Sequence, residues 1–376
     1  MFIIKKLKKN PFLYALNCKF KAYRTKKLYQ NIIKYYEKKS IEPFSTLNTR
    51  KLDNVFYFGG DEHQDKSGFL QGLSDVFNVK YFTQYDGKYG AYSRTDNNCK
   101  RLNSNRLVEL FKEYECEGFI PDILLMQTWA WRVDVDTLIQ IKRKYKCLII
   151  NIGMDDRHSY TDHGNWSQGT FGLIPALDLA LTCAPECVEW YKKEGVDALF
   201  FPEASHSDFF YPMNIDRIYE VGFIGAKYGV RAEVVNALKC AGINVKCYGN
   251  GWPDGRLPLE DTNKFFNQCK IVLGIGTIGH TRDFYALKLR DFDALMAGSV
   301  YLTHKNPDLE MLFNNKKELF LADNVNDFAE LATELLENEE LLKSCRNRAY
   351  SIANAEHSYT VRFQMLKAYI KRAKVI

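Results

Sequence analysis

The stretch of the sequence with the clearest chemical pattern is residues 270–303, which combines glycines, cations and acids. An apolar run ends there at Gly274, and Gly274, Gly276 and Gly279 follow the spacing GxGxxG. Glycines at such positions let backbone amides approach a diphosphate closely. The same spacing occurs in ordinary tight turns, so the glycines alone leave both interpretations open.

Two cations and two acids follow the glycine turn. Lys288 and Arg290 precede Asp291 and Asp293 at the start of an apolar segment that ends at Gly298. Basic side chains and a helix N-terminus together neutralise a diphosphate, and a carboxylate accepts hydrogen bonds from ribose hydroxyls. We therefore expect a nucleoside diphosphate site here. In the alternative, the cations lie on an exposed helix face and pair with the aspartates.

A second set of candidates follows apolar runs in the first half of the chain. His63 comes after the first run, and Asp155, Asp156 and His158 come after the fourth. Carboxylates and histidines are the side chains that accept a proton from an attacking hydroxyl. We expect these four to act as a catalytic base or to bind an acceptor. For each of them, a plain loop or helix-capping role is an equal alternative.

Other pairs in the first half carry weaker signals. Trp129 and Trp131 could stack on a sugar, although core packing is the commoner role of tryptophan. Asp134 and Asp136 stand near a predicted helix start, where capping explains them. The ten cysteines include no CxxC pair, so we predict reduced thiols and no metal site.

From Asn54 onward, short apolar runs alternate with segments of helical period. These are the strands and helices that must position the candidate residues. The pattern predicts an α/β protein with two doubly wound, Rossmann-like domains and closing C-terminal helices. Strands are predicted at 54–60, 79–84, 122–127, 147–153, 179–184, 198–202, 220–225, 244–248, 270–274, 300–303 and 319–322. Helices are predicted at 68–77, 105–114, 135–145, 185–194, 231–241, 259–269, 286–297 and 325–337, and throughout 339–373.

The domain boundary is predicted from composition. Residues 203–217 contain Pro, Ser, Asn and Asp without a sustained period. We therefore expect a basic extension at 1–51, an acceptor domain at 52–205 and a donor domain at 206–376. Ligands bind such folds at the carboxyl ends of the strands, where the strand order reverses.

The positive charge is concentrated in the N-terminal extension. Residues 1–51 hold 14 Lys and Arg against two acids, a charge of +12, so the rest of the chain carries −6 of the net +6. Apolar residues among these lysines suit an anionic membrane surface. A solvated extension that packs on the body is the equal alternative. We predict no nucleic-acid partner, because the remaining sequence has no basic stripe or recognition motif.

Localisation follows from what the sequence lacks. No apolar run reaches the roughly 18 residues of a membrane-spanning helix, and the N-terminus has no signal-peptide pattern. We expect a cytoplasmic protein, with a peripheral position at the inner face of the membrane if residues 1–51 bind lipid.

The sequence KLRDFDALMAGSVYLTHKNPDLEMLF, from Lys288 to Phe313, resembles the CgeB-like (spore maturation protein) glycosyltransferases. The resemblance also takes in GLIPALDLALTCAPECVEWYKKEGVDALFFPEASHSDFFYP from Gly172, VGFIGAKYGVRAEVVNAL from Val221, INVKCYGNGWPDGRL from Ile243 and HSYTVRF from His357. It implies a GT-B fold and transfer of a sugar from a UDP- or GDP-sugar to a glycan, lipid-linked or protein acceptor. It also implies that neither a metal nor a permanently bound cofactor is needed, and the chain shows no DxD motif of the metal-dependent type.

The wider family of retaining GT-B enzymes carries a Glu-x7-Glu signature, and the second acid binds the nucleotide ribose. Asp293 matches that second acid, whereas Tyr285 stands where the first Glu would be. The contact to the donor sugar and the stereochemistry therefore stay open. The resemblance assigns Lys227 and Arg231 to the donor phosphates, and Trp252 to the base.

Three residues of the glycine turn complete the expected donor site. They are Gly276, Thr277 and His280. Hydroxyl and imidazole groups there could donate hydrogen bonds to the diphosphate, and a surface position is the alternative for His280.

Two other functions stay open. A sugar-nucleotide epimerase or hydrolase on the same fold would act on the donor without an acceptor. The second option is a non-catalytic protein that binds a nucleotide sugar. It stays possible because Tyr285 replaces the first Glu of the retaining-enzyme signature. A dehydrogenase is disfavoured, because its ribose-binding acid would end the next strand, whereas Asp293 lies in a predicted helix.

Overall fold

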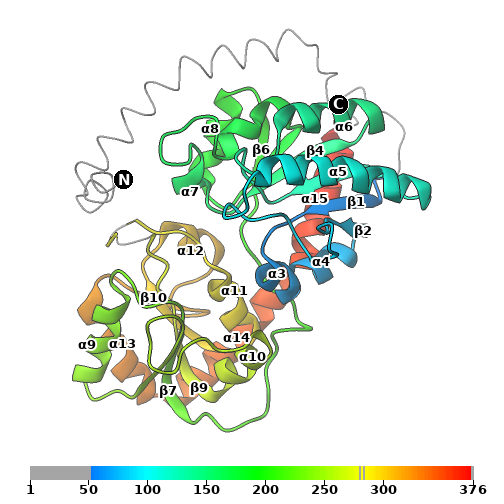
Figure 1. Cartoon of the computed structure of the whole chain (residues 1–376). Coiled ribbons are helices and arrows are strands. Elements are labelled where there is room, and N and C mark those ends of the chain that lie inside the picture. The colour runs from blue at the N-terminus through cyan, green and yellow to red at the C-terminus, as the bar shows by residue number, and fades with distance from the viewer. Residues whose placement is uncertain (1–51, 279–280, 283, 374–376) are drawn as a thin grey trace, which may run out of the picture. The chain divides into compact units, whose positions relative to one another are not determined.

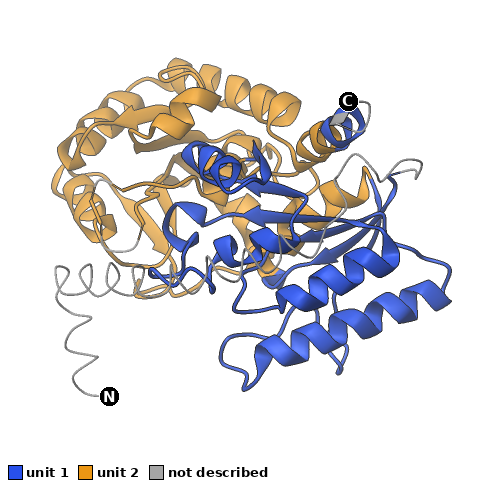
Figure 2. Cartoon of the chain, turned by 90° about the horizontal axis from the view of Figure 1, so that it is seen from above, with its two compact units in different colours: residues 1–62, 77–201, 367–376 blue, residues 63–76, 202–366 orange. Residues whose placement is uncertain are grey.

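The computed structural model describes residues 52–278, 281–282 and 284–373 (Figure 1). Contacts within the chain define two compact units (Figure 2). Among the described residues, unit 1 comprises 52–62, 77–201 and 367–373, and unit 2 comprises 63–76 and 202–366. The extension at 1–51, with its proposed membrane contact, lies outside the described residues.

Unit 1 is built on six parallel strands in the order β2-β1-β3-β4-β5-β6. Their bounds are β1 Asn54–Phe58, β2 Asn78–Tyr81, β3 Ile123–Met126, β4 Leu148–Gly153, β5 Leu179–Thr182 and β6 Asp197–Phe200. In β3 and β4 every residue is buried, as expected of parallel strands covered on both faces. The strand order reverses at β1, which pairs with both β2 and β3.

The helices of unit 1 follow the apolar period of the sequence. They are α5 Cys99–Cys116, α6 Val135–Tyr145, α7 Asp156–Ser159, the 3-10 helix η3 Thr170–Ala176 and α8 Pro185–Lys193. Helix α8 begins with Pro185, whose fixed φ suits the first helical position. Helix α6 ends at Lys146, which adopts the left-handed conformation with φ of 52°.

Unit 2 contains five parallel strands in the order β11-β10-β9-β7-β8. They are β7 Tyr219–Ile224, β8 Val245–Tyr248, β9 Cys269–Leu273, β10 Val300–His304 and β11 Phe320–Ala322. The order reverses at β7, because the chain first runs to β8 on one side and then to β9 on the other. Right-handed crossovers therefore place the first helix and the later connecting helices on opposite faces of the sheet.

The helices of unit 2 cover both faces of that sheet. They are α9 Arg231–Cys240, α10 Leu259–Gln268, α11 Leu289–Met296, α12 Pro307–Leu312, α13 Val325–Leu336, α14 Glu339–Glu356 and α15 Tyr359–Ala373, whose last residues belong to unit 1. Helices α9 and α13 pack against each other, and α11 packs against α10 and α14 (Figure 1).

A short segment from the first half of the sequence belongs to unit 2. It holds the π-helix η2 Asp65–Phe69 and the helix α4 Leu70–Ser74, and it begins just after the start of α3 Glu62–Gln64. Phe69 packs edge-on against Tyr359 and Phe363, with ring centroids 5.2 and 5.1 Å apart. Asp75 accepts hydrogen bonds from Thr360 (2.6 Å) and lies 3.1 Å from His206. The sequence analysis had grouped these residues with the first domain.

The predicted fold class is confirmed. All eleven predicted strands are present, and 339–373 is helical except for a break at residues 357–358 between α14 and α15. The short elements α3, α7, α12 and η3 are not predicted, because three to seven residues are too few to show a helical period. None of the helices in the described residues is both long and apolar enough to cross a bilayer, and no disulfide joins the cysteines described there.

Candidate functional site

The carboxyl ends of β7 and β9 meet where the strand order of unit 2 reverses. Gly225 ends β7 with a φ of 156°, and its amide donates to the carbonyl of Tyr248 (2.8 Å). A Cβ added at Gly225 would lie 3.2 Å from a guanidinium nitrogen of both Arg231 and Arg290. Glycine is required there, because the two arginines come together directly above it.

Both arginines donate to the same backbone oxygen. The Nη2 atoms of Arg231 and Arg290 lie 3.2 and 3.4 Å from the carbonyl of Ile275, just past β9. Their Nη1 atoms donate to the carbonyls of Ala226 (2.9 Å) and Ile224. Phe223 packs under both guanidinium groups, at 5.7 and 5.0 Å. Two like charges are thus fixed side by side.

The two arginines have no carboxylate partner among the described residues of the chain. Arg231 is 5% exposed, and the Nε atoms of both residues are buried without a hydrogen-bond partner in the described part of the structure. Burial and the neighbouring charge of Arg290 lower the pKa of Arg231 to about 10. Buried cations without a counter-ion are costly, and an anionic ligand would remove that cost.

Lys288 stands beside this pair at the N-terminus of α11. Its amide donates to the Asp291 carboxylate (2.8 Å), which also accepts from the Tyr301 hydroxyl. The Cγ of Lys288 lies 3.6 Å from the position of a Cβ added at Gly276. Gly276 and Lys288 therefore lie together at the N-terminus of α11, where the helix dipole favours negative charge.

Asp293, the predicted ribose acid, lies one turn into α11 and is 8% exposed. Burial raises the pKa of this carboxyl well above its usual range, and the charge of Arg290 acts in the opposite direction. The ion-pair interpretation of residues 288–293 finds no support, because no salt bridge of the described residues joins Asp291 or Asp293 to Lys288 or Arg290.

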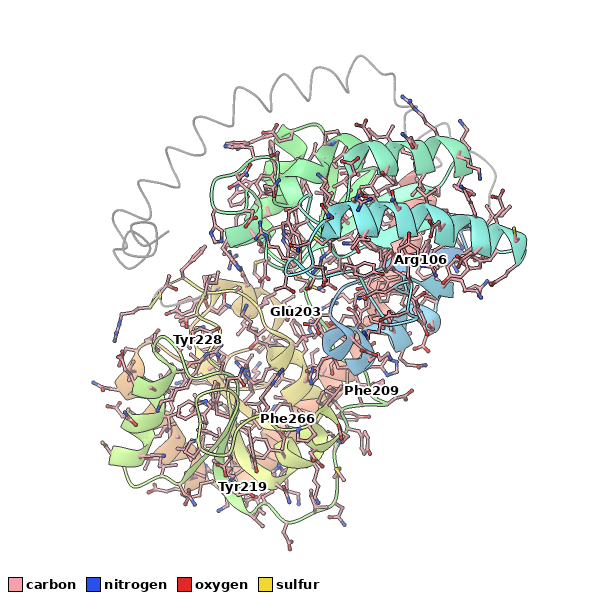
Figure 3. The ribbon with its side chains drawn as sticks, in the orientation of Figure 1. Arg106, Glu203, Phe209, Tyr219, Tyr228 and Phe266 are labelled. Carbon is pink, nitrogen blue, oxygen red and sulfur yellow. The ribbon has the colours of Figure 1, made fainter. Side chains whose placement is uncertain are left out.

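The loop before α9 carries the other cations predicted from the resemblance. Tyr228, labelled in Figure 3, lies with its ring 3.9 Å from the Arg231 guanidinium. Lys227 lies over the ring of Trp252 at 5.0 Å. Trp252 is 9% exposed and its indole donates to the carbonyl of Gly225 (2.8 Å). Trp252 thus holds the 249–255 loop against the end of β7.

The glycine turn continues into a cavity. Thr277 is buried and pairs with Tyr285 through an isolated antiparallel bridge, whereas Gly279 and His280 lie outside the described residues. Tyr285 stacks on His304 from the end of β10, with ring centroids 4.0 Å apart and planes 20° apart. The sequence gives no signal for His304, because nothing in a single histidine 19 residues after Tyr285 indicates that the two rings stack.

The candidates of unit 1 divide into one buried and several exposed residues. Asp156 is 1% exposed and accepts from the hydroxyls of Thr170 (2.5 Å) and Tyr191 (3.1 Å). Burial raises the pKa of Asp156 to about 6. A Cβ at Gly153 would overlap this carboxyl, so the end of β4 is shaped around it. Through these contacts, the side chain of Asp156 anchors the start of α7 to the interior of unit 1.

Asp155 and His158 lie on the outer side of the same turn. Their side chains are 40% and 34% exposed, and the His158 Nε2 lies 3.7 Å from Asp155 Oδ1. Between them, Arg157 makes two hydrogen bonds to Glu186 (2.5 and 2.8 Å). His63, exposed in α3, belongs to unit 2 and not to this group.

Trp129 and Trp131 form a half-buried cluster near these residues. The two rings stack with centroids 5.9 Å apart, and Arg132 lies 5.4 and 4.8 Å from them. The indole of Trp129 lies 3.4 Å from the Ser159 hydroxyl of α7. A Cβ at Gly60 would overlap the Arg132 guanidinium, so this cluster covers the end of β1, where the strand order of unit 1 reverses.

Residues 231–368 match the family model described as Glycosyl transferase-like. The matched segment begins at Arg231 and contains Lys288, Arg290 and Asp293, and it covers less than half of the chain. A comparison with curated protein sequences finds no match.

Several solved structures share the fold of nearly the whole chain. Sucrose-phosphate synthase from Thermosynechococcus elongatus matches with a TM-score of 0.59 and 11% identity, over 86% of this chain and 100% of that one. HepE from Anabaena, in complex with UDP and glucose, gives a TM-score of 0.59 and 9% identity over the same shares of 86% and 100%. A candidate UDP-N-acetylglucosamine 2-epimerase from Listeria monocytogenes gives a TM-score of 0.53 and 12% identity, over 87% of this chain and 98% of that one.

The fold is GT-B. At these identities the likeness concerns the fold alone, because one fold supports unrelated reactions. The activity of this chain must therefore be argued from its own side chains.

Proposed function

We propose that this chain is a metal-independent glycosyltransferase that takes a sugar from a UDP- or GDP-sugar bound in unit 2. The observation that carries the proposal is the pair of guanidinium groups of Arg231, which is buried, and Arg290, which is partly buried; they lie side by side without a carboxylate partner in the described residues. The family-model match over the same residues and the UDP complex of the structural neighbour HepE support it.

The reaction follows from where charge develops. The bond between the anomeric carbon and the diphosphate oxygen breaks, and the diphosphate leaves with the electron pair. Arg231, Arg290 and Lys288, with the amides at the N-terminus of α11, stabilise this growing negative charge. They supply the role that a bound cation has in metal-dependent transferases. Asp293 holds the ribose hydroxyls of the nucleotide.

The acceptor hydroxyl forms the new bond to the anomeric carbon and loses its proton to a base. In this proposal Asp155 and His158 are the groups of unit 1 that serve the acceptor, because both are exposed and in contact with each other. His63 is retained as a third candidate, whereas Asp156 holds the turn in place from the inside. The acceptor is a glycan, a lipid-linked sugar or a protein, as the CgeB-like resemblance implies, and residues 1–51 would bring the protein to an anionic membrane surface.

The second candidate function is an epimerase or hydrolase of the nucleotide sugar, which the fold of the Listeria neighbour favours. Such an enzyme would use the same cations to hold the diphosphate. It differs in needing no acceptor, so its products form from donor alone.

The experiment that tests the proposal incubates the full chain with UDP-glucose or GDP-mannose in EDTA, with and without an extract of membrane lipids and glycans. We expect nucleoside diphosphate to be released only when the extract is present, and labelled sugar to appear in the extract. Release or rearrangement of the sugar from donor alone supports the second candidate instead. If the added EDTA abolishes turnover, the metal-independent mechanism is wrong.

A further inference from the structure

A cavity of about 330 Å³ opens beside the two arginines within unit 2. Helix α9 and the first turn of α13 form two of its walls, and the turn after β9 and the end of β10 form the others. It is lined by Val230, Val234, Ile275, Thr277, Arg282, Tyr285, His304, Asp323, Asn324, Val325, Asn326 and Phe328. Its volume is at the lower end of small-molecule sites.

The lining divides into an apolar wall and a polar wall. Val234 of α9 and Phe328 of α13 are both almost fully buried and close the apolar side. Asn324 and Asn326 belong to the polar rim, where the Asn324 side chain caps α13. A ring with apolar C–H faces and hydroxyl edges is complementary to such a surface.

One buried polar atom in this lining lacks a partner. Thr277 is 1% exposed, and its hydroxyl makes no hydrogen bond within the described part of the chain. A buried hydroxyl left without a partner costs free energy. A ligand in the cavity would satisfy it.

The cavity shares residues with the surroundings of the proposed diphosphate site. Ile275 lines the cavity and its carbonyl binds both arginines. His304 also lines the cavity, and its Cε1 lies 3.6 Å from the position of a Cβ added at Gly276, the same position that Lys288 approaches. A group attached to a diphosphate on Arg231 and Arg290 therefore has this space next to it.

We infer that this cavity receives the glycosyl group of the donor, and that Thr277, Tyr285 and His304 determine which sugar fits. This inference rests on the proposed function and deepens it. Tyr285 occupies the position where a Glu of the retaining enzymes would contact the sugar, and here its ring and that of His304 form one face of the space.

The lining favours an uncharged sugar. Burial, together with the charges of Arg290 and Arg231, lowers the pKa of His304 to about 3, so its ring is neutral at physiological pH. On the rim, Arg282 is paired with Glu233, and Asp323 lies 3.6 Å from Lys305, so these two lining residues of opposite charge each have a partner. A neutral hexosyl group therefore fits this lining.

The test uses saturation-transfer NMR on the full chain with two probe pairs, UDP with UDP-glucose and GDP with GDP-mannose. The variant Asn326→Trp fills the exposed rim of the cavity, and Glu330→Trp places the same ring one turn further along α13, outside the lining. We expect Asn326→Trp to reduce saturation of the sugar protons several-fold while the base protons keep their signal. Glu330→Trp should match the wild type.

A second variant removes only the unpartnered hydroxyl. Thr277→Val should weaken binding of the sugar nucleotide about two- to tenfold relative to its nucleoside diphosphate. Thr333→Val, on the exposed side of α13, is the matched control. It should change the affinity for neither the sugar nucleotide nor the nucleoside diphosphate.

Three results would overturn the inference. If Asn326→Trp weakens UDP or GDP as much as their sugar conjugates, the cavity holds the nucleoside. If Asn326→Trp changes the binding of neither the nucleoside diphosphates nor their sugar conjugates, the cavity lies outside the donor site. If neither UDP nor GDP binds the wild-type chain at all, the proposed function itself fails, and the inference fails with it.

Discussion

The carboxyl edges of the two sheets differ in how their charges are neutralised. In unit 2, Arg231 and Arg290 are held by backbone carbonyls and aromatic rings, without a carboxylate partner among the described residues. In unit 1, Arg157 is paired with Glu186, and Arg94 lies 2.7 Å from Asp162. Arg157 and Arg94 of unit 1 thus have carboxylate partners, whereas Arg231 and Arg290 of unit 2 have none among the described residues.

In the proposed function, this contrast assigns the donor to the edge in unit 2 and the acceptor to the edge in unit 1. A donor brings a diphosphate and needs fixed positive charge, whereas an acceptor hydroxyl is neutral and needs a base and a surface. The exposed Asp155 and His158 and the stacked Trp129 and Trp131 supply groups of the second kind. The predictions below test the contrast in order of the size of the effect.

The largest effect is expected from removing both cations. Arg231→Gln with Arg290→Gln should weaken binding of UDP or GDP about 1,000-fold, because two charge-assisted contacts are lost. Lys239→Gln, at the other end of α9 and exposed, is the matched control and should leave binding unchanged. Calorimetric titration of the three proteins measures this. Equal affinities for the double variant and the control would remove the contrast between the two edges.

The next effect concerns the buried acid of unit 1. Because burial raises the pKa of Asp156 to about 6, the folded state binds more protons than the unfolded state between pH ~4 and ~6. Its contribution to the free energy of unfolding is therefore present at low pH and falls as pH rises through that window, by at most about 3 kcal/mol. Asp156→Asn should flatten this decline in urea unfolding curves measured across the window.

Asp136→Asn is the control for that experiment, because it alters an exposed carboxylate on α6 of the same unit. It should keep the wild-type pH dependence. An unchanged slope in Asp156→Asn would show that Asp156 does not titrate in this way, and that the edge of unit 1 is neutralised by other groups.

A smaller effect is expected at Asp293. Asparagine has nearly the same size and shape as this buried side chain, so the fold should be kept. Asp293→Asn should weaken UDP or GDP about tenfold through the ribose hydroxyls. It should leave inorganic pyrophosphate unaffected in competition titrations. An equal loss for pyrophosphate would place Asp293 at the phosphates and not at the ribose.

The smallest effect is expected for a paired cation of unit 1. Arg157→Gln removes two hydrogen bonds to Glu186 that are partly exposed to solvent. We expect a loss of less than about 1 kcal/mol in the free energy of unfolding and no change in nucleotide binding. A marked loss of nucleotide affinity would mean that unit 1 also binds the diphosphate, contrary to the comparison.

Much of the fold was predictable, because buried parallel strands are continuous apolar runs and each one stands out between polar loops. The segment 63–76 was misgrouped for the opposite reason. Its membership in unit 2 depends on contacts of Phe69 and Asp75 with residues nearly 300 positions later. Such contacts leave no mark in local periodicity.

Charge and spacing in the sequence select Lys288, Arg290 and Arg231 as candidates, and the structure places Arg231 and Arg290 side by side. The role of the Ile275 carbonyl could not be predicted from the sequence, because every residue has a carbonyl. The stack of Tyr285 on His304 could not be predicted either, because only the fold brings the two rings together. It also treated Asp155 and Asp156 alike. Adjacent residues in a tight turn point in different directions, and only the fold decides which one is buried.

The most direct test of the central claim is a crystal structure of the full chain with UDP or GDP. The account predicts that the diphosphate lies at the ends of β7 and β9, with its oxygens accepting hydrogen bonds from Arg231, Arg290 and the first amides of α11. A diphosphate bound elsewhere, with both guanidinium groups still held only by backbone carbonyls, would contradict it.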